Sequence, residues 1–177
     1  MRKIIVYSSK TGFTEKYAGW LSNRLNAEML RLEDAKKLPS DEFNDVDTII
    51  YGGWVMAGKL VGAEWFLERV NEWKEKKLAL FAVGGCPADA PDTEALIKNI
   101  LSNEQRKYVK AFYCQGGMNY ERMKLPSKLA MKAFASMVNK KKDKTEADEK
   151  MAEMIAKSYD ISDEKFIDPI VEYVCEN

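Results

Sequence analysis

The fold is decided by the stretch Ile4-Ile5-Val6-Tyr7-Ser8-Ser9-Lys10-Thr11-Gly12-Phe13-Thr14. A short apolar run in it ends in a loop that is rich in hydroxyl side chains and holds a single glycine. An amphipathic stretch follows at once, in which apolar residues recur at helical spacing. This pattern predicts a buried strand over Lys3–Tyr7 and a helix over Thr14–Leu25. A strand that leads directly into a helix is typical of a parallel β/α unit.

The same alternation continues along the chain and predicts a sheet of parallel strands. Further strands are expected at Glu28–Arg31, Thr48–Tyr51, Leu78–Val83 and Val109–Cys114. Helices are expected at Ala63–Trp73, Thr93–Leu101, Ser127–Val138, Glu146–Tyr159 and Asp163–Tyr173. The third, fourth and fifth strands are expected to end at Gly52-Gly53, Gly84-Gly85 and Gly116-Gly117. This order predicts an α/β fold with a doubly wound, five-stranded parallel sheet and helices on both faces.

Length and composition indicate one ordinary globular domain over residues 1–177. The chain has a mass of 20.2 kDa, 46% hydrophobic and 32% charged residues, which excludes a disordered or fibrous chain. It has no histidine, so histidine triads and imidazole metal sites are excluded and no metal site is expected. The odd set Cys86, Cys114 and Cys175 favours reduced thiols in the cytoplasm. The first apolar run is too short for a signal peptide or a membrane span.

The loop after the first strand has the chemistry of a phosphate site. Hydroxyls of Ser9, Thr11 and Thr14 can donate hydrogen bonds to phosphate oxygens, and Gly12 lets the backbone approach an anion closely. The free amides and the dipole at the start of the helix favour the same anion. The loop lacks the lysine pattern of a nucleotide triphosphate loop and the glycines of a dinucleotide site. A single terminal monophosphate is therefore the expected ligand group.

The whole stretch Ile5–Leu21 resembles the signature of the flavodoxin family. The positions that carry the resemblance are Tyr7, Ser9, Gly12, Thr14, Ala18 and Leu21. The resemblance implies a flavodoxin-like sheet with strand order 2-1-3-4-5 and FMN as the cofactor. It further implies that the FMN phosphate is bound by Ser9, Lys10, Thr11, Gly12, Phe13 and Thr14.

In the flavodoxin family, the loops after the third and fourth strands sandwich the isoalloxazine ring. The resemblance assigns these roles to the segments Gly53–Gly58 and Gly84–Asp89. The candidate contacts are Trp54, Val55, Met56, Ala57, Gly84, Gly85, Cys86, Pro87 and Asp89. Trp54 is a candidate stacking partner because an aromatic face suits a flat ring, although it could also be a hydrophobic plug at the sheet edge. Cys86 fits a small residue in a turn, since no histidine is present to activate it.

A basic segment after the fifth strand departs from a small flavodoxin. Residues 106–145 hold 11 Lys/Arg and two acidic residues, a net charge of +9, so the remainder carries −9. The added helical segment spans about residues 116–160. Its start, Gly116-Gly117-Met118-Asn119-Tyr120-Glu121-Arg122, leads into a lysine-rich apolar helix and resembles the flavodoxin-type protoporphyrinogen dehydrogenases. Those enzymes bind FMN and pass electrons from a porphyrinogen to a quinone, which makes Tyr120, Arg122 and Lys124 candidates for substrate contact.

The basic helix allows several interpretations. Its apolar side is expected to contain Leu125, Leu129, Phe134, Met137 and Val138, with lysines around it that include Lys140-Lys141-Lys142. Such a helix could lie on the inner face of an anionic membrane, cover a flat substrate with carboxylates, or pack on the sheet with solvated lysines. Nucleic acid is not expected as a partner, because no recognised binding module accompanies the charge.

Three classes of function follow from these features. The first is an FMN-dependent oxidoreductase of the cytoplasm that acts on a flat molecule such as a porphyrinogen or a quinone. The second is a flavodoxin electron carrier that shuttles electrons between redox proteins. A receiver domain without flavin is disfavoured, because Tyr7-Ser8 and Tyr51-Gly52 stand where a receiver needs acidic residues.

Overall fold

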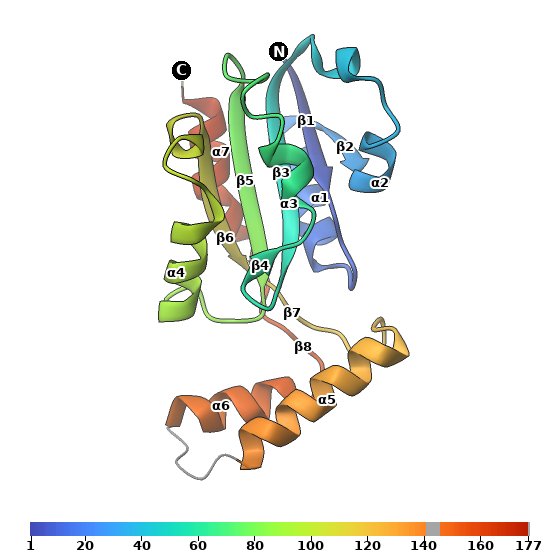
Figure 1. Cartoon of the computed structure of the whole chain (residues 1–177), viewed down its shortest axis with the longest axis vertical. Coiled ribbons are helices and arrows are strands. Elements are labelled where there is room, and N and C mark those ends of the chain that lie inside the picture. The colour runs from blue at the N-terminus through green and yellow to red at the C-terminus, as the bar shows by residue number, and fades with distance from the viewer. Residues whose placement is uncertain (141–145, 177) are drawn as a thin grey trace.

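The core of the protein is a parallel sheet of five strands (Figure 1). A computed structural model describes residues 1–140 and 146–176. The strands are β1 (Arg2–Tyr7), β2 (Glu28–Arg31), β3 (Val46–Met56), β5 (Lys77–Gly84) and β6 (Val109–Gln115). They lie in the order β2-β1-β3-β5-β6, and a short β4 (Lys59–Leu60) pairs antiparallel with β3. Numbered among the five parallel strands, this is the predicted order 2-1-3-4-5, so the predicted fold class is confirmed.

Helices cover both faces of this sheet. One face is covered by α1 (Phe13–Leu25) and α7 (Asp168–Cys175), and the other by α2 (Leu32–Ala35), α3 (Ala63–Leu67) and α4 (Pro91–Ile100). Short 3-10 helices are η1 (Ser40–Phe43), η2 (Gln105–Lys107) and η3 (Glu164–Ile167). Neighbouring residues of a strand point to opposite faces. Ile49 and Tyr51 therefore join the core on one side of β3, and Ile50 joins the core on the other side.

An additional unit, called the insertion here, occupies residues 117–160 between β6 and η3. It consists of β7 (Gly117–Met118), α5 (Leu125–Lys140), α6 (Glu146–Ile155) and β8 (Tyr159–Asp160). β7 and β8 pair antiparallel, and the two helices pack through Ala135, Val138, Ala152 and Ile155. The insertion lies beyond the carboxyl ends of the parallel strands (Figure 1). Of the predicted lysine run, Lys141 and Lys142 lie outside the described residues.

The glycines of the third strand are placed differently from the prediction. Gly52 and Gly53 do not end this strand, because β3 continues to Met56 and turns back into β4 at Ala57-Gly58. A Cβ atom on Gly52 would lie 2.1 Å from Cζ of Phe81, so glycine is needed there for packing inside the sheet. The predicted loop Gly53–Gly58 is therefore largely a β-hairpin arm.

Three predicted helices have other boundaries. The helix predicted at Ala63–Trp73 ends at Leu67, and Trp73 is buried from a following turn, where it contacts the rings of Phe43, Trp65 and Phe66. Trp73 is apolar and buried although it lies in a turn, so its spacing from the apolar residues of α3 resembles that of a longer helix. The helix predicted at Glu146–Tyr159 ends at Ile155, because Tyr159 pairs with Met118 in the β7–β8 ribbon.

The predicted closing helix Asp163–Tyr173 is divided. Its first turn is the 3-10 helix η3, and α7 begins at Asp168 with Pro169 in its first turn. Proline is tolerated there because the first amides of a helix have no acceptor within the helix.

Among the described residues, none of the helices is both long enough and apolar enough to cross a membrane.

Candidate functional site

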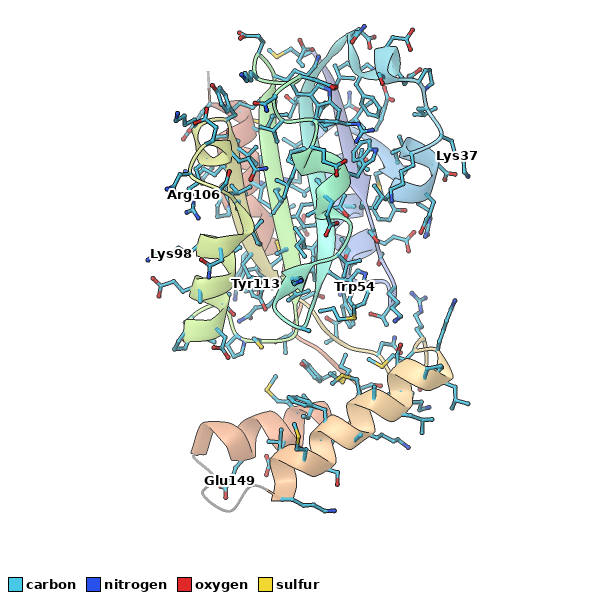
Figure 2. The ribbon with its side chains drawn as sticks, viewed as in Figure 1. Lys37, Trp54, Lys98, Arg106, Tyr113 and Glu149 are labelled. Atoms are coloured by element: carbon cyan, nitrogen blue, oxygen red, sulfur yellow. The ribbon has the colours of Figure 1, made fainter. Side chains whose placement is uncertain are left out.

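The predicted cofactor residues follow three strands that are neighbours in the sheet. Ser9–Thr14 follow β1, the hairpin arm of β3 holds Trp54–Ala57, and Gly85–Asp89 follow β5. Because parallel strands end at the same edge, these segments meet on the side that faces the insertion (Figure 1). Trp54 lies at this end of the sheet in Figure 2, and so does Tyr113 of β6.

The loop after β1 has the geometry of an anion cradle. Its first amide, of Ser8, donates to the Gly52 carbonyl at 2.9 Å, which ties the loop to β3. Gly12 caps α1 with φ of 101°, in the left-handed region that favours glycine. The first helical hydrogen bond joins the Lys16 amide to the Gly12 oxygen at 2.9 Å. The preceding amides at the helix start are therefore available to an anion.

The buried hydroxyl of Ser9 is consistent with a phosphate in this loop. Among the described residues, its Oγ is buried and has no hydrogen-bond partner. A buried hydroxyl without a partner is costly, so such groups usually bond to a ligand or to water. Thr14, at 1% exposure, is also almost fully buried at the start of α1. The donors present thus fit a phosphate group, as expected for FMN.

Trp54 lies beside the phosphate loop, on strand β3 and not in a loop after it. It belongs to β3 and is half-buried, and Lys10 Nζ lies 5.1 Å from its ring centroid. Met56 is 53% exposed at the end of the strand, whereas Val55 pairs with Leu60 of β4. Trp54 and Met56 therefore stay candidate flavin contacts, held on a strand. Ala57 forms the hairpin turn with a positive φ of 48°.

Two tyrosine hydroxyls hold the loop after β5, and the sequence analysis missed both. Tyr113 donates to the Cys86 carbonyl at 2.8 Å, and Tyr159 donates to the Gly85 carbonyl at 3.0 Å. A Cβ atom on Gly84 would lie 2.5 Å from the Tyr113 hydroxyl oxygen, so the chain needs glycine there. Sequence alone offers no signal for such pairs, because Tyr159 comes from the insertion.

Burial changes the acidity of the groups around this loop. It raises the pKa of Tyr113 and that of Tyr159 to about 12, so both hydroxyls stay protonated donors. Burial, followed by the charge of Asp92, also raises the pKa of the Cys86 thiol. A neutral thiol is a poor nucleophile, which agrees with the interpretation of Cys86 as a small residue in a turn. Pro87 and Asp89 are exposed at the tip of the loop.

The insertion contacts the phosphate loop through a hydrogen bond and α1 through an ion pair. Lys10 Nζ donates to Ser127 Oγ of α5 at 2.8 Å. Lys16 Nζ lies 3.0 Å from Oδ2 of Asp160 in β8, which it pairs with. Phe13 packs against β7, the first strand of the insertion, where a Cβ atom on Gly117 would lie 2.9 Å from the Phe13 ring. The site and the insertion therefore form a continuous surface.

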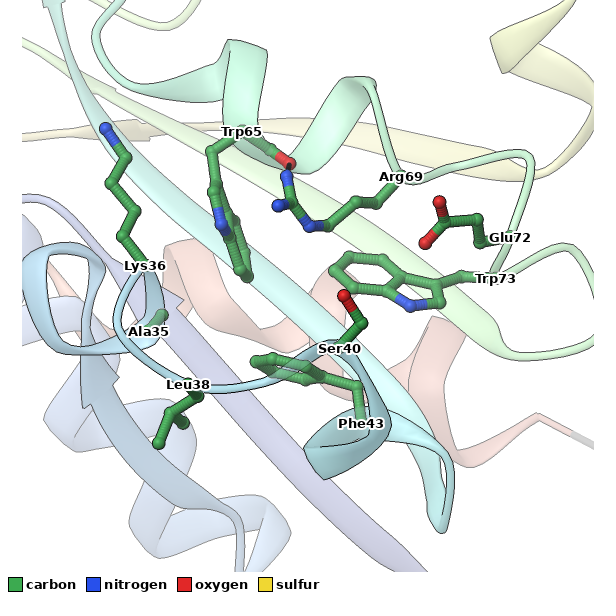
Figure 3. A pocket seen from close by; sticks show the side chains of 9 residues that line it. All are labelled: Ala35, Lys36, Leu38, Ser40, Phe43, Trp65, Arg69, Glu72 and Trp73. Atoms are coloured by element: carbon green, nitrogen blue, oxygen red, sulfur yellow. Dashed lines mark hydrogen bonds between the residues drawn. The ribbon is translucent and has the colours of Figure 1, made fainter.

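An open cavity of about 460 Å³ lies between the loop and the insertion. Its lining includes Thr11, Gly12, Phe13, Lys16, Met118 and Arg122. This volume is in the usual range for small-molecule sites. A second hollow, on the face of the sheet that α3 covers, measures only about 20 Å³ among Phe43, Trp65 and Trp73 (Figure 3). A space of that size holds a single water, so it is not a substrate site.

The three candidate substrate contacts of the insertion have different surroundings. Tyr120 is buried at 8% exposure, and its hydroxyl donates to the Ile155 carbonyl, so it stabilises the insertion. Arg122 lies against Gly12 at the phosphate loop. Lys124 is exposed just before α5.

Comparison with known protein families gives a match over most of the chain. A family model described as a Flavodoxin domain matches residues 4–146. None of the curated proteins matches the chain. The family match agrees with the flavodoxin resemblance of the phosphate loop and supports FMN as the cofactor.

Several solved structures have a similar fold at low sequence identity. The Trp repressor binding protein of Bacillus subtilis is 16% identical, with a TM-score of 0.50 over 67% of this chain and 85% of that one. The two-electron reduced flavodoxin of Megasphaera elsdenii is 23% identical, with a TM-score of 0.47 over 63% and 82%. A flavoprotein of Lactobacillus acidophilus, solved in complex with FMN, is 15% identical, with a TM-score of 0.43 over 64% and 91%.

Proposed function

The chain belongs to the flavodoxin domain family, and on that premise we propose that it is an FMN-dependent oxidoreductase of the protoporphyrinogen dehydrogenase type. Its proposed substrates are a flat, anionic electron donor such as a porphyrinogen and a quinone acceptor. The observation that carries this proposal is the contact between the basic insertion and the phosphate loop. An electron carrier needs an accessible flavin edge, whereas a substrate enzyme benefits from an element that covers its site.

In this proposal, the chain's own residues divide into two groups. Ser9, Thr11, Thr14 and the amides at the start of α1 hold the phosphate of FMN. Trp54 and the loop Gly85–Asp89 flank the flavin ring. Bound FMN would supply the electron-accepting chemistry. The hydrogen bonds that Tyr113 and Tyr159 donate to the loop after β5 keep it at one position, which limits the reorganisation that accompanies substrate binding.

The lining of the open cavity combines charged and apolar groups. It holds the cations Arg122 and Lys16 beside the acids Glu121 and Asp160, with Lys16 paired to Asp160, and Lys124 is exposed just before α5. Apolar surface comes from Phe13 and Met118 of the same lining. A flat ring with carboxylate substituents matches both the cationic and the apolar parts of this lining, because its face is apolar and its edge is anionic.

The test is to reduce the FMN-loaded protein with protoporphyrinogen under anaerobic conditions and to monitor the visible absorption of the flavin. Protoporphyrinogen is expected to bleach the flavin bands, and a quinone is expected to restore them. The matched control is free FMN at the same concentration with the same reagents. If protoporphyrinogen leaves the bands unchanged while a reduced redox protein bleaches them rapidly, the chain is an electron carrier instead.

The exposed face of α5 supports a further part of the proposal, contact with an anionic membrane surface. Leu125, Leu129 and Met137 lie on one face of this helix and are 68%, 59% and 64% exposed. Lys132 and Lys140 are exposed beside them. Apolar side chains flanked by lysines suit the boundary between anionic headgroups and acyl chains, where a membrane quinone would also be reached.

Co-sedimentation with vesicles tests the membrane contact. The protein is expected to bind vesicles that contain phosphatidylglycerol and to remain free with phosphatidylcholine alone. Leu129→Glu on α5 is expected to abolish binding. Leu38→Glu, at a position that is 37% exposed on the sheet domain, is the matched control and should bind as before. Equal binding by both variants would contradict the proposal.

A further inference from the structure

Arg122 of the insertion lies against the phosphate loop at its central glycine. A Cβ atom added to Gly12 would lie 2.5 Å from Nη1 of Arg122 and 3.6 Å from its Cζ. The guanidinium therefore lies directly beside the peptide that leads into α1. Both residues line the open cavity together with Thr11 and Lys16.

The backbone that carries Arg122 is held by hydrogen bonds within the insertion. The side-chain oxygen of Asn119 accepts from the amides of Glu121 and Arg122, each at 3.1 Å. The Tyr120 amide donates to Ser158 Oγ at 3.0 Å. An Asx turn of this kind, made by the Asn119 side chain, fixes the local backbone. Arg122 therefore starts from a defined position beside the loop.

Lys10 of the loop and Lys16 of α1 each have a partner in the insertion. Lys10 donates to Ser127 of α5, and Lys16 is paired with Asp160 of β8. Both contacts link the loop region to the insertion, and of the two only the Lys16 contact pairs the lysine with a carboxylate. Among the described residues, the cationic side chain that a Cβ atom on Gly12 would meet is that of Arg122.

This inference rests on the proposed function, in which the loop binds FMN. We propose that Arg122 is a phosphate-binding residue that the insertion contributes to the cofactor site. A guanidinium can donate two parallel hydrogen bonds to phosphate oxygens, and its cation offsets the charge of Glu121, which also lines the cavity. Cofactor binding and the position of the insertion are then coupled, and the coupling acts in both directions.

Fluorescence titration with FMN and with riboflavin tests this role, because riboflavin lacks the phosphate. Arg122→Ala is expected to raise the Kd of FMN by roughly tenfold or more, as for loss of a charged hydrogen bond, and to leave the Kd of riboflavin unchanged. Arg122→Lys is expected to be intermediate, since it keeps the charge without the planar fork. Lys98→Ala, which changes an exposed lysine of α4 outside the insertion, is the matched control and should change neither Kd.

Hydrogen exchange provides a second readout of the coupling. FMN is expected to protect the amides of the Asn119–Leu125 segment more than riboflavin does, and this difference should vanish in Arg122→Ala. An unchanged preference for FMN over riboflavin in Arg122→Ala would overturn the inference. Equal weakening of both ligands would also overturn it, because the role would then be structural. If the unaltered protein shows no preference for FMN, the proposed phosphate site itself fails.

Discussion

The buried hydroxyl of Ser9 yields a prediction with two effects of opposite sign. Its Oγ is buried without a hydrogen-bond partner among the described residues. Ser9→Ala removes this unsatisfied group from the protein without FMN, and it removes a donor to phosphate from the protein with FMN. The variant is therefore expected to be more stable than the unaltered protein without FMN and to bind FMN more weakly.

The two magnitudes follow from the state of the hydroxyl. A buried polar group without a partner costs about 1–3 kcal/mol. Its removal should raise Tm by about 2–4 °C for each kcal/mol in a chain of this size. A hydrogen bond to a charged phosphate contributes about 1.5–3 kcal/mol, so the Kd of FMN should rise roughly 10- to 150-fold.

Thermal unfolding of the protein without FMN and fluorescence titration with FMN measure the two effects. Ser22→Ala is the matched control, because the Ser22 hydroxyl donates to the Ala27 carbonyl at 2.6 Å at the end of α1. That variant should lose stability and keep its affinity for FMN. A Ser9→Ala protein that is less stable without FMN, or that binds FMN as tightly as before, would refute the assignment of Ser9 to the phosphate site.

Three further predictions concern packing, thiol access and pH. Gly117→Ala should destabilise the protein by about 1–3 kcal/mol in urea unfolding, because its Cβ would lie 2.2 Å from the Tyr159 carbonyl oxygen; Gly19→Ala in α1, with nothing within 4 Å of its Cβ, should stabilise it by up to about 1 kcal/mol. In a Cys175→Ser background, FMN should slow alkylation of Cys86, measured by mass spectrometry, and equal rates with and without FMN would remove Cys86 from the flavin site. Burial raises the pKa of Tyr159 from 10.0 to about 12, so the stability that the protonated Tyr159 hydroxyl contributes is fully present below pH 10 and is lost as the pH rises through 12. The difference in unfolding free energy between the unaltered protein and Tyr159→Phe should therefore narrow between pH 10 and 12. A difference that stays constant over this range would contradict the prediction.

The sequence was sufficient for the architecture because local pattern and tertiary structure agree there. The apolar runs at Ile4–Tyr7 and Leu78–Val83 are buried on both faces, so their length and β-branched content predict parallel strands. The loop Ser9–Thr14 could be recognised because a phosphate cradle needs hydroxyls, a glycine and a helix start in one continuous segment.

The remaining features depend on contacts between distant residues. The sequence pattern predicts that the third strand ends at Gly52, whereas this glycine makes room for the ring of Phe81 in the neighbouring strand. The predicted helix Glu146–Tyr159 includes Tyr159, yet this residue pairs with Met118 in the β7–β8 ribbon. No local pattern shows that Arg122 returns to Gly12, since the position depends on how the insertion folds back on the sheet.

Parallel titration of the unaltered protein with FMN and riboflavin tests the central claim most directly. The claim is that the loop after β1 binds the phosphate of FMN. We expect one FMN per chain and a markedly lower Kd for FMN than for riboflavin, with the difference due to the phosphate alone. Equal affinity for the two flavins, or binding of neither, would contradict the claim.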